Sequence, residues 1–384
     1  MTKMFADAIR KATELTKSGR LKEATAFIQS TLKGGTDDVE PADQAVVEGE
    51  FTRIDKVDSE PVRRPGGIGA RQRLSDTLLR LAAGGVPTSK PFLSPANNPL
   101  PDGAEFLSLS HTGMHGSRNY RLYVPSNRTT EMPLIVMLHG CTQNPEDFAA
   151  GTGMNLLSEE FGCVIAYPGQ PIGANAQKCW NWFKPEDQVR GNGEPGLLAG
   201  LTRDVLRDFP VDSARVYVAG LSAGGAAANI MGSAYPDIFS AVGAHSGLPV
   251  GSAHDVPSAF AAMRNGSRGN RQTNVVPTIV FQGLADTTVN PKNGQAIVDQ
   301  VAGHFTGVTK ITEKQKTSRG RAVRTTRYSD HNQQLLAELW EVEGAGHAWS
   351  GGYPGGSYTD PVGPNASREM VRFFLEHRRD KTNS

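Results

Sequence analysis

Cysteine is scarce in this chain of 384 residues, which contains only Cys141, Cys163 and Cys179. An odd total of three is far too low for a fold held together by disulfides, and no CxxC spacing suggests a zinc site. The default expectation is therefore buried free thiols. If the protein works outside the cytosol and one pair is oxidised, Cys141 and Cys179 are the favoured partners.

Long apolar runs are absent as well. Runs such as LIVML at 134–138 fall far short of the roughly 20 residues that cross a bilayer, so no transmembrane helix is expected. The N-terminal sequence also has no uninterrupted apolar segment before a small-residue cleavage site, which a secretory signal requires. The sequence thus predicts cytosolic residence.

Neither sign of charge is in excess, since 40 Lys and Arg residues stand against 39 Asp and Glu residues and the formal net charge is +1. No basic cluster is interleaved with aromatic residues, which argues against nucleic acid or an anionic membrane surface as a partner. With 38% apolar and 21% charged residues, the chain is typical of a globular protein with one large core and an accessory segment.

The first 100 residues differ in character from the rest. Apolar stripes predict two short helices, at 4–17 and 20–33, which form a helical hairpin over 1–33. This hairpin is expected to be a cap packed on the domain that follows or a flexible arm, or else to mediate partner binding or self-association. Residues 34–100 are polar and rich in Gly and Pro, which predicts a partly disordered linker.

From residue 101 to 384 the pattern changes to short apolar runs that alternate with segments of helical period. Such alternation is typical of an α/β domain with a mainly parallel, doubly wound sheet covered by helices on both faces. The first two predicted strands are joined without a helix and should be antiparallel at one edge. The predicted strands cover 106–110, 120–124, 134–138, 164–167, 216–219, 242–245, 278–282 and 339–342, and the main predicted helices cover 197–209, 223–231, 294–301 and 366–377.

The candidate nucleophile is Ser222, at the centre of a G-x-S-x-G motif that begins at Gly220. The motif alone is weak evidence because the chain contains 43 glycines, but here it follows a predicted strand and precedes a helix of small residues. That context is the nucleophile elbow of the α/β-hydrolase fold, in which the serine backbone is strained and its neighbours must be small. Gly220, Gly224 and Gly225 meet this requirement.

A serine hydroxyl needs a histidine to accept its proton and a carboxylate to orient that histidine, and this fold places them in the order Ser, Asp or Glu, His. His347 follows a predicted strand in a Gly-rich loop and is the preferred base. Asp286 follows another predicted strand at the same edge of the sheet and is the preferred acid. Asp255 and Asp299 are the alternatives, although both are more simply explained as surface charges.

The loop at 139–143 directly follows the predicted strand 134–138, where this fold provides one backbone donor to the oxyanion. The amide of Cys141 or Thr142 is the candidate for this donor, and the amide of Ala223, the residue after the nucleophile, is the second. His139 is expected to orient the loop by hydrogen bonds and to take no proton in the reaction.

Five motifs stand out together: Leu138-His-Gly-Cys, Lys178-Cys-Trp-Asn-Trp-Phe, Gly220-Leu-Ser-Ala-Gly-Gly, Gly283-Leu-Ala-Asp and Gly346-His-Ala-Trp. This set resembles the polyhydroxybutyrate (PHB) depolymerase family of esterases, which includes feruloyl and acetyl xylan esterases. The likeness covers about residues 105–377. It implies an α/β-hydrolase fold, the catalytic triad Ser222, Asp286 and His347, and ester hydrolysis through an acyl-enzyme.

The resemblance also implies that Trp182, Trp180 and Trp349 line the substrate pocket, with Trp182 favoured over the other two and core or rim packing as the alternative for each. It makes an extracellular location the alternative to the cytosol. The predicted function is therefore that of a serine esterase acting on hydroxyalkanoate esters, oligomers or polyester, with no metal or organic cofactor. Removal of feruloyl or acetyl groups from xylan is the nearest alternative. A peptidase or polyamide hydrolase would use the same triad, because acyl transfer does not identify the leaving group.

Overall fold

The computed structural model describes residues 100–316 and 320–379, which include every strand and helix predicted after residue 101. The predicted hairpin at 1–33 and all but the last residue of the predicted linker lie outside the described residues. Among the described helices, none combines the length and apolar character that a bilayer crossing requires.

A ten-stranded sheet forms the centre of the domain. Its strands are β1 (Glu105–Gly113), β2 (Gly116–Val124), β3 (Met132–Leu138), β4 (Val164–Pro168), β5 (Val211–Leu221), β6 (Ala241–His245), β7 (Thr278–Gly283), β8 (Thr309–Lys316), β9 (Ala322–Ser329) and β10 (Leu335–Val342). They are arranged in the order β1-β2-β4-β3-β5-β6-β7-β10-β9-β8. The strands from β4 to β10 in this order are parallel, and antiparallel pairings complete both edges. The expected antiparallel pair at one edge is confirmed as β1 and β2.

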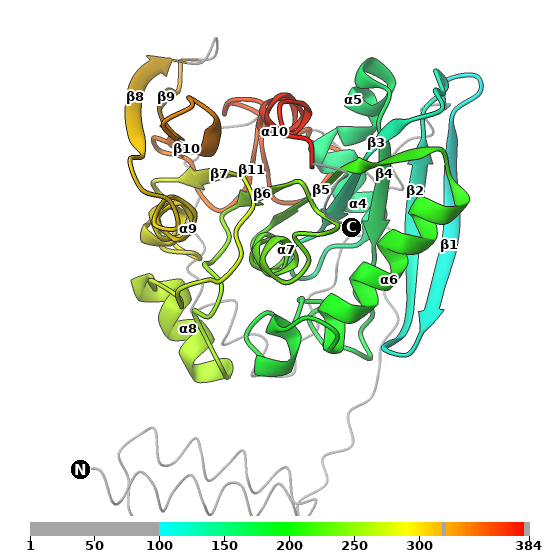
Figure 1. Ribbon diagram of the computed structural model, residues 1–384, viewed down its shortest axis with the longest axis horizontal. Helices are drawn as coiled ribbons and strands as arrows, with labels where there is room; N and C mark the ends of the chain where they lie inside the picture. Colours follow the sequence, from blue (N-terminus) through cyan, green and yellow to red (C-terminus); the bar gives the residue numbers. More distant parts are fainter. Residues whose placement is uncertain (1–99, 317–319, 380–384) are drawn as a thin grey trace, which may run out of the picture. The chain divides into compact units, whose positions relative to one another are not determined.

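Helices cover both faces of the sheet, as the alternating pattern predicts (Figure 1). They are α4 (Pro145–Thr152), α5 (Met154–Phe161), the 3₁₀ turn η1 (Pro185–Gln188), α6 (Gly193–Asp208), α7 (Ala223–Ala234), α8 (Val256–Asn265), α9 (Lys292–Ala302) and α10 (Ala366–Leu375). Helices α6, α7 and α9 pack on one face, whereas α4, α5 and α10 pack on the other. Two short parallel strands, β11 (Trp349–Ser350) and β12 (Thr359–Asp360), lie in the segment between β10 and α10.

The central strands are apolar on both faces because helices cover both. Every residue of β3 and β4 is buried, and their sequences, MPLIVML and VIAYP, are almost wholly hydrophobic. The parallel strands β3, β5, β6, β7 and β10 all direct their carboxyl ends to the same edge of the sheet. The segments that follow these strands therefore meet at one edge, where this architecture places its ligands.

Several elements were not predicted from the sequence. The sequence patterns do not predict α4, α5 and α8, although Asp255 begins α8 with a capping box. The hairpin of β8 and β9 was also missed. All eight residues of β8 are exposed, so this strand has no apolar alternation that could reveal it.

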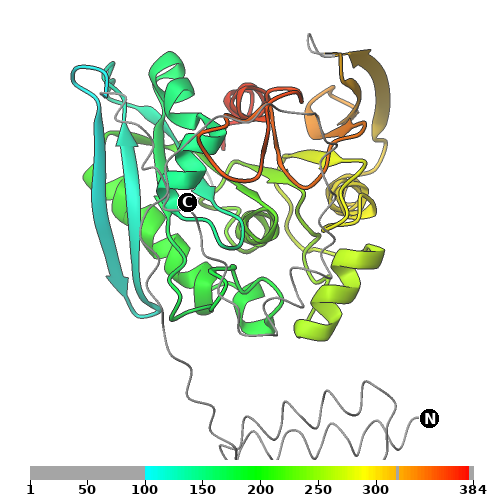
Figure 2. The same ribbon diagram turned by 180° about the vertical axis from the view of Figure 1, so that it is seen from behind.

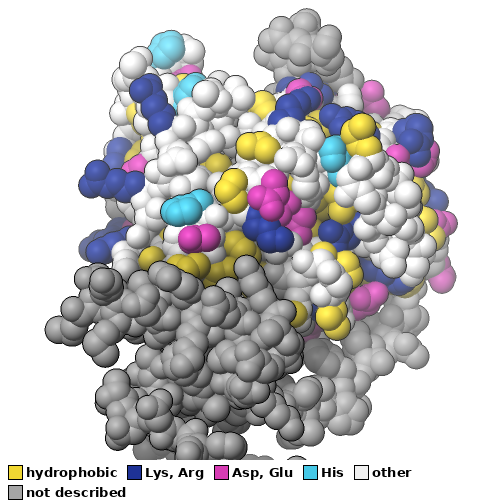
Figure 3. Space-filling view, turned by 90° about the horizontal axis from the view of Figure 1, so that it is seen from below, with side chains coloured by type: hydrophobic (Ala, Val, Ile, Leu, Met, Phe, Trp, Pro, Cys, Tyr) yellow, Lys and Arg dark blue, Asp and Glu magenta, His cyan; other side chains and the backbone are white. Residues whose placement is uncertain are grey.

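Charged side chains of both signs are intermixed on the described part of the face that Figure 3 shows. This distribution matches the near-neutral formal charge of +1.

Candidate active site

Ser222 occupies a sharp turn between β5 and α7. Its backbone has φ 58° and ψ −118°, a conformation that is strained for a non-glycine residue and that the elbow motif predicts. The Ser222 amide donates to the carbonyl of His245 on the neighbouring strand (2.9 Å), and the Ser222 carbonyl accepts from the amide of Ala226 (3.0 Å). These two bonds hold the turn from both sides, with the serine 9% exposed.

The flanking glycines are required by the close approach of backbone to backbone. A Cβ atom at Gly224 would lie 2.0 Å from the Leu138 carbonyl oxygen, and one at Gly220 would lie 2.3 Å from the Gly224 carbonyl carbon. The predicted need for small residues around Ser222 is thus confirmed. The same contacts place the loop after β3 directly against the turn that carries Ser222.

Asp286 and His347 lie together, as the sequence predicts. Asp286 is in the loop that follows β7 and His347 is in the loop that follows β10. Nδ1 of His347 is 2.8 Å from Oδ2 of Asp286. The other carboxylate oxygen of Asp286 accepts the amides of Thr288 and Val289, each at 2.8 Å. The carboxylate therefore has fixed partners on both oxygens.

The charge state of Asp286 follows from these contacts. Burial raises the pKa of a carboxyl group, but the hydrogen bonds from His347 and from the two amides outweigh burial, so that the pKa of Asp286 is lowered. An ionised Asp286 accepts the Nδ1 proton of His347. The neutral imidazole then has its lone pair on Nε2, the form that a general base needs.

The structure distinguishes between the two predicted oxyanion donors in the loop after β3. The Thr142 amide donates to the Gln177 carbonyl (2.7 Å), so it is already engaged, and the proposal for Thr142 is corrected on this ground. The amides of Cys141 and Ala223 have no acceptor among the residues that the structure describes. These two amides remain the candidate donors.

A disulfide joins this loop to the segment that follows β4. Cys141 is bonded to Cys179, so the default expectation of three free thiols is wrong for these two residues and the favoured pair is the one formed. Cys163 is a free, buried thiol whose pKa burial raises to about 12. It is therefore a packing residue rather than a reactive one.

His139 orients the loop, as expected. Its Nδ1 donates to the Gly140 carbonyl (2.7 Å) and its Nε2 accepts the Gln170 amide (3.1 Å). Burial lowers the pKa of His139 to about 4, so both bonds are made by the neutral ring. A neutral ring with both nitrogens bonded to the backbone is not available for proton transfer.

All three predicted pocket tryptophans are buried, and two of them have almost no exposed surface. Trp180 has no exposed surface and donates to the His139 carbonyl, and Trp349 is 1% exposed and donates to the Ser367 hydroxyl. Neither can contact a substrate in this structure, which corrects their assignment. Trp182 is 7% exposed and remains the candidate.

His245 is a site residue that the sequence did not single out. Besides its carbonyl bond to Ser222, its Nε2 accepts the Ser350 amide (2.9 Å), and its ring stacks on Trp349. Burial lowers the pKa of His245 to about 3, which keeps the ring neutral and able to accept. His245 thus connects the nucleophile turn with the segment that follows His347. The predicted place of His245 at the carboxyl end of β6, next to β5, is the sequence signal that could have identified it as a site residue.

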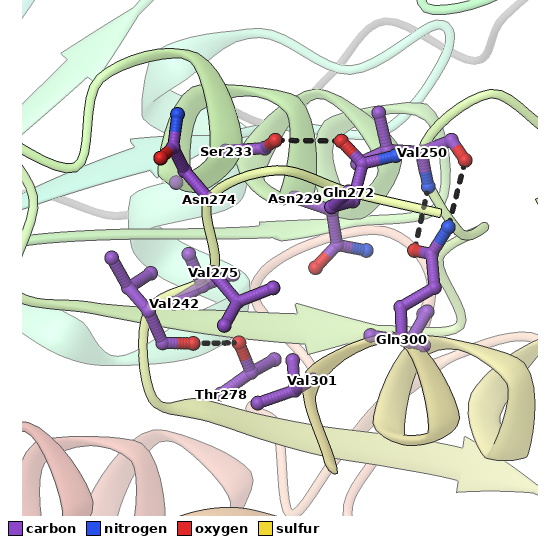
Figure 4. Close-up of a pocket in the computed structure, with 13 residues that line it drawn as sticks. Asn229, Ser233, Val242, Val250, Gln272, Asn274, Val275, Thr278, Gln300 and Val301 are labelled. Atoms are coloured by element: carbon purple, nitrogen blue, oxygen red, sulfur yellow. Dashed lines mark hydrogen bonds between the residues drawn. The ribbon is translucent and has the colours of Figure 1, made fainter. Parts of the chain in front are cut away.

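Figure 4 shows a pocket elsewhere in the domain, next to Val242 and Thr278 at the amino ends of β6 and β7. Side-chain amides of Gln272 and Gln300 cross-link its wall, through bonds to Ser233 and to the backbone of Val250. The pocket volume of about 30 Å³ has room for one or two water molecules but not for an ester. This pocket lies at the opposite ends of the strands from Ser222.

Comparison with known proteins gives concordant results. A family model described as "Esterase PHB depolymerase" matches residues 118–318. The chain is 32% identical over 239 residues to poly(3-hydroxyalkanoate) depolymerase C of Paucimonas lemoignei, covering 59% of this chain and 57% of that protein. It is 30% identical over 192 residues to feruloyl esterase B of Neurospora crassa, covering 44% and 64% respectively. This chain thus spans somewhat less than two thirds of either relative.

Among solved structures, an acetyl xylan esterase from Aspergillus awamori is similar with a TM-score of 0.56 at 18% identity. The match covers 71% of this chain and 99% of that one, and it shows a shared fold.

Proposed function

Because the chain belongs to the PHB depolymerase family of esterases and has the α/β-hydrolase fold, we propose that it hydrolyses carboxylic esters with Ser222 as nucleophile. The observation that carries the proposal is the 2.8 Å hydrogen bond between His347 and Asp286, at the sheet edge where the strained Ser222 turn is also found. The proposed catalytic triad is Ser222, Asp286 and His347.

In the first half of the reaction, Ser222 Oγ attacks the ester carbonyl carbon while His347 Nε2 takes the hydroxyl proton. Asp286 holds the Nδ1 proton and stabilises the imidazolium. The negative charge that develops on the carbonyl oxygen is stabilised by the free amides of Cys141 and Ala223. Collapse of the tetrahedral intermediate breaks the ester C–O bond, and His347 returns its proton to the departing alcohol.

In the second half, His347 accepts a proton from water, and the resulting nucleophile attacks the acyl-enzyme. The acid leaves and the proton returns to Ser222. Within the described residues, no group of three or more His, Cys, Asp or Glu side chains is placed to hold a metal ion.

We propose hydroxyalkanoate esters as the substrate class, because the 32% identical relative is named as a poly(3-hydroxyalkanoate) depolymerase. Feruloyl or acetyl esters of plant polysaccharide are the second candidate, since feruloyl esterase B is a relative at 30% identity. Rates on 3-hydroxybutyrate oligomers, methyl ferulate and acetylated xylan, compared at equal enzyme concentration, separate the two. An amide panel added to this assay tests the peptidase alternative.

The nucleophile is tested by labelling with a fluorophosphonate probe, followed by peptide mapping. We expect one modified residue, Ser222, and no labelling or ester hydrolysis by the Ser222→Ala variant. Ester hydrolysis that persists in Ser222→Ala would contradict the proposal.

The Cys141–Cys179 disulfide supports a working location in an oxidising compartment rather than in the cytosol. Measurement of the thiol content of the protein isolated from its native source, before any exposure to air, tests this. One free thiol is expected per chain, whereas three would favour the cytosol.

A further inference from the structure

Two buried polar side chains connect the oxyanion loop, residues 139–142, with α4. Oε1 of Gln143 accepts the Gly140 amide (2.9 Å), and Nε2 of Gln143 donates to Oδ2 of Asp147 (2.8 Å). Gln143 is 2% exposed and Asp147 is 5% exposed, so bulk water does not compete for the groups that form these bonds. Such buried side-chain bonds fix geometry more strongly than exposed ones.

Asp147 extends the connection to the segment that follows His347. Its carboxylate accepts both the Ser357 amide (2.8 Å, at Oδ1) and the Ser357 hydroxyl (2.5 Å, at Oδ2). Gln143 also donates to the Ser357 carbonyl (3.2 Å). The segment lies against α4 (Figure 2). The contact is between backbones, since a Cβ at Gly356 would lie 2.4 Å from Gly151.

The Asp147 carboxylate accepts hydrogen bonds from Gln143 and Ser357, and no described Lys, Arg or His side chain forms an ion pair with it. It lies in the first turn of α4, where the helix dipole favours negative charge. A buried carboxylate without a cation needs its hydrogen bonds, because an unpaired one is costly. Displacement of Gln143 or Ser357 would leave the Asp147 carboxylate without donors, and this cost keeps both side chains in their present positions.

The Gly140–Cys141 peptide group shows what this arrangement controls. Its carbonyl oxygen accepts from His139 Nδ1 (2.7 Å) and from the Gln143 amide (3.3 Å). A trans peptide group is planar, so its N–H, which is the Cys141 amide, points opposite to that carbonyl. Gln143 thus bonds to both sides of Gly140: its backbone amide donates to the Gly140 carbonyl, and its side-chain oxygen accepts the Gly140 amide.

We propose that Gln143 and Asp147 are positioning residues that orient the Cys141 amide toward the oxyanion and keep its loop in register with the segment after His347. This inference rests on the proposed esterase function, since it assigns the support for one of the two oxyanion donors. Neither residue contacts the substrate. Loss of one oxyanion donor lowers kcat by about 10²–10³-fold in hydrolases, so misorientation of the Cys141 amide should have an effect approaching that range.

Two near-isosteric variants test the pair. Gln143→Glu keeps an acceptor for the Gly140 amide but sets two carboxylates against each other, and Asp147→Asn sets two amides together. We expect each to lower kcat by about 10–100-fold and to change KM by less than about threefold. The double variant Q143E/D147N restores a carboxylate–amide bond in the reverse direction, and we expect it to recover at least about tenfold in kcat over the poorer single variant.

The chain contains a matched control. Gln295 and Asp299 are the same residue types at the same spacing, joined by a 2.7 Å bond on the exposed side of α9. Gln295→Glu and Asp299→Asn should change kcat by less than about twofold. Ser357→Ala, which removes one donor to Asp147 from a partly exposed position, serves if a core variant does not fold, with an expected loss of about 3–10-fold in kcat.

Inhibition by a trifluoromethyl ketone distinguishes orientation of the Cys141 amide from a general structural role of Gln143 and Asp147, because the serine adduct of this inhibitor carries an oxyanion. If the pair orients the Cys141 amide, the inhibition constant rises across the variants by the same factor as kcat/KM falls, with active sites counted by fluorophosphonate titration. Unchanged inhibition constants, or loss explained wholly by fewer titratable sites, overturn the inference alone. Absence of fluorophosphonate labelling at Ser222 in the unaltered protein overturns the proposed function and this inference with it.

Discussion

Ser222 combines a positive φ of 58° with glycine neighbours that have no space for a side chain. Gly224→Ala should therefore be among the most damaging single-methyl changes, because its Cβ would lie 2.0 Å from a backbone oxygen that cannot rotate away. We expect a loss of about 3 kcal/mol or more in the free energy of unfolding, measured by urea denaturation.

Gly173→Ala is the control for this change, since a Cβ at Gly173 would meet nothing within 4 Å. Its unfolding free energy should change by less than about 0.5 kcal/mol. Equal stability of the Gly224→Ala and Gly173→Ala proteins would contradict the packing argument.

The two buried histidines predict how stability depends on pH. Burial lowers the pKa of His245 to about 3 and that of His139 to about 4, whereas an unfolded histidine titrates near 6.5. As the pH falls, the unfolded chain therefore binds protons at these two histidines before the folded protein does. Their contribution to stability is complete above about pH 6.5, and each loses about 1.4 kcal/mol per pH unit below it, until the folded pKa is reached.

His245→Gln tests this sign, because glutamine keeps an acceptor for the Ser350 amide but does not titrate. The free energy of unfolding, measured between pH 6 and pH 5, should fall less steeply in this variant than in the unaltered protein, by about the contribution of one histidine. Identical slopes would show that His245 is protonated in the folded state.

At the residue scale, the sequence predicts the meeting of Asp286 and His347 because chain order and strand position restrict the choice. It cannot separate Cys141 from Thr142, since the difference depends on the Gln177 carbonyl, which is 35 residues away along the chain. The assignment of Trp180 and Trp349 to the substrate pocket is wrong for a related reason. Residue type indicates an aromatic surface, but the burial of Trp180 and Trp349 depends on tertiary packing.

At the element scale, the oxyanion loop depends on a covalent link. The Cys141–Cys179 disulfide spans 38 positions, and its removal should lower the free energy of unfolding by about 3–4 kcal/mol and lower kcat as the loop loosens. Thermal unfolding and ester hydrolysis with and without a thiol reductant measure both effects. The Cys141→Ser/Cys179→Ser protein should show both defects without reductant, and no further change with it.

Elements with a long apolar run or a clear apolar stripe were predictable from the sequence, whereas short or fully exposed elements were not. Strands β3 and β4 are apolar throughout, and α6 and α9 have clear helical stripes, so all four were predicted. Helix α4 has only eight residues, too few for a helical period to be recognised, although Asn144 as its N-cap and Gly153 as its C-cap mark its ends.

At the scale of the whole molecule, all the proposed catalytic groups lie between residues 139 and 347. A chain that begins at residue 101 should therefore retain kcat on a soluble p-nitrophenyl ester within about twofold. This tests the predicted domain boundary. Loss of activity with retained cooperative unfolding would show that residues 1–100 contribute to the site.

A chain that begins at residue 114 is the informative contrast. It lacks β1, which pairs with β2 along nine residue pairs and contacts α6. We expect it to unfold at a clearly lower temperature, because the residues of β2 and the surface of α6 that β1 covers lose their partners.

The far edge of the sheet has a consequence for how copies of the protein meet. Strand β8 has a free edge in the ten-strand order, and every one of its residues, TKITEKQK, is exposed. An unprotected edge strand can recruit a strand from another molecule, but the charged side chains of Lys310, Lys314 and Lys316 on this edge disfavour such pairing. We therefore expect the protein to resist intermolecular β-sheet formation along this edge when it is concentrated, and replacement of these lysines by threonine should make it prone to aggregation.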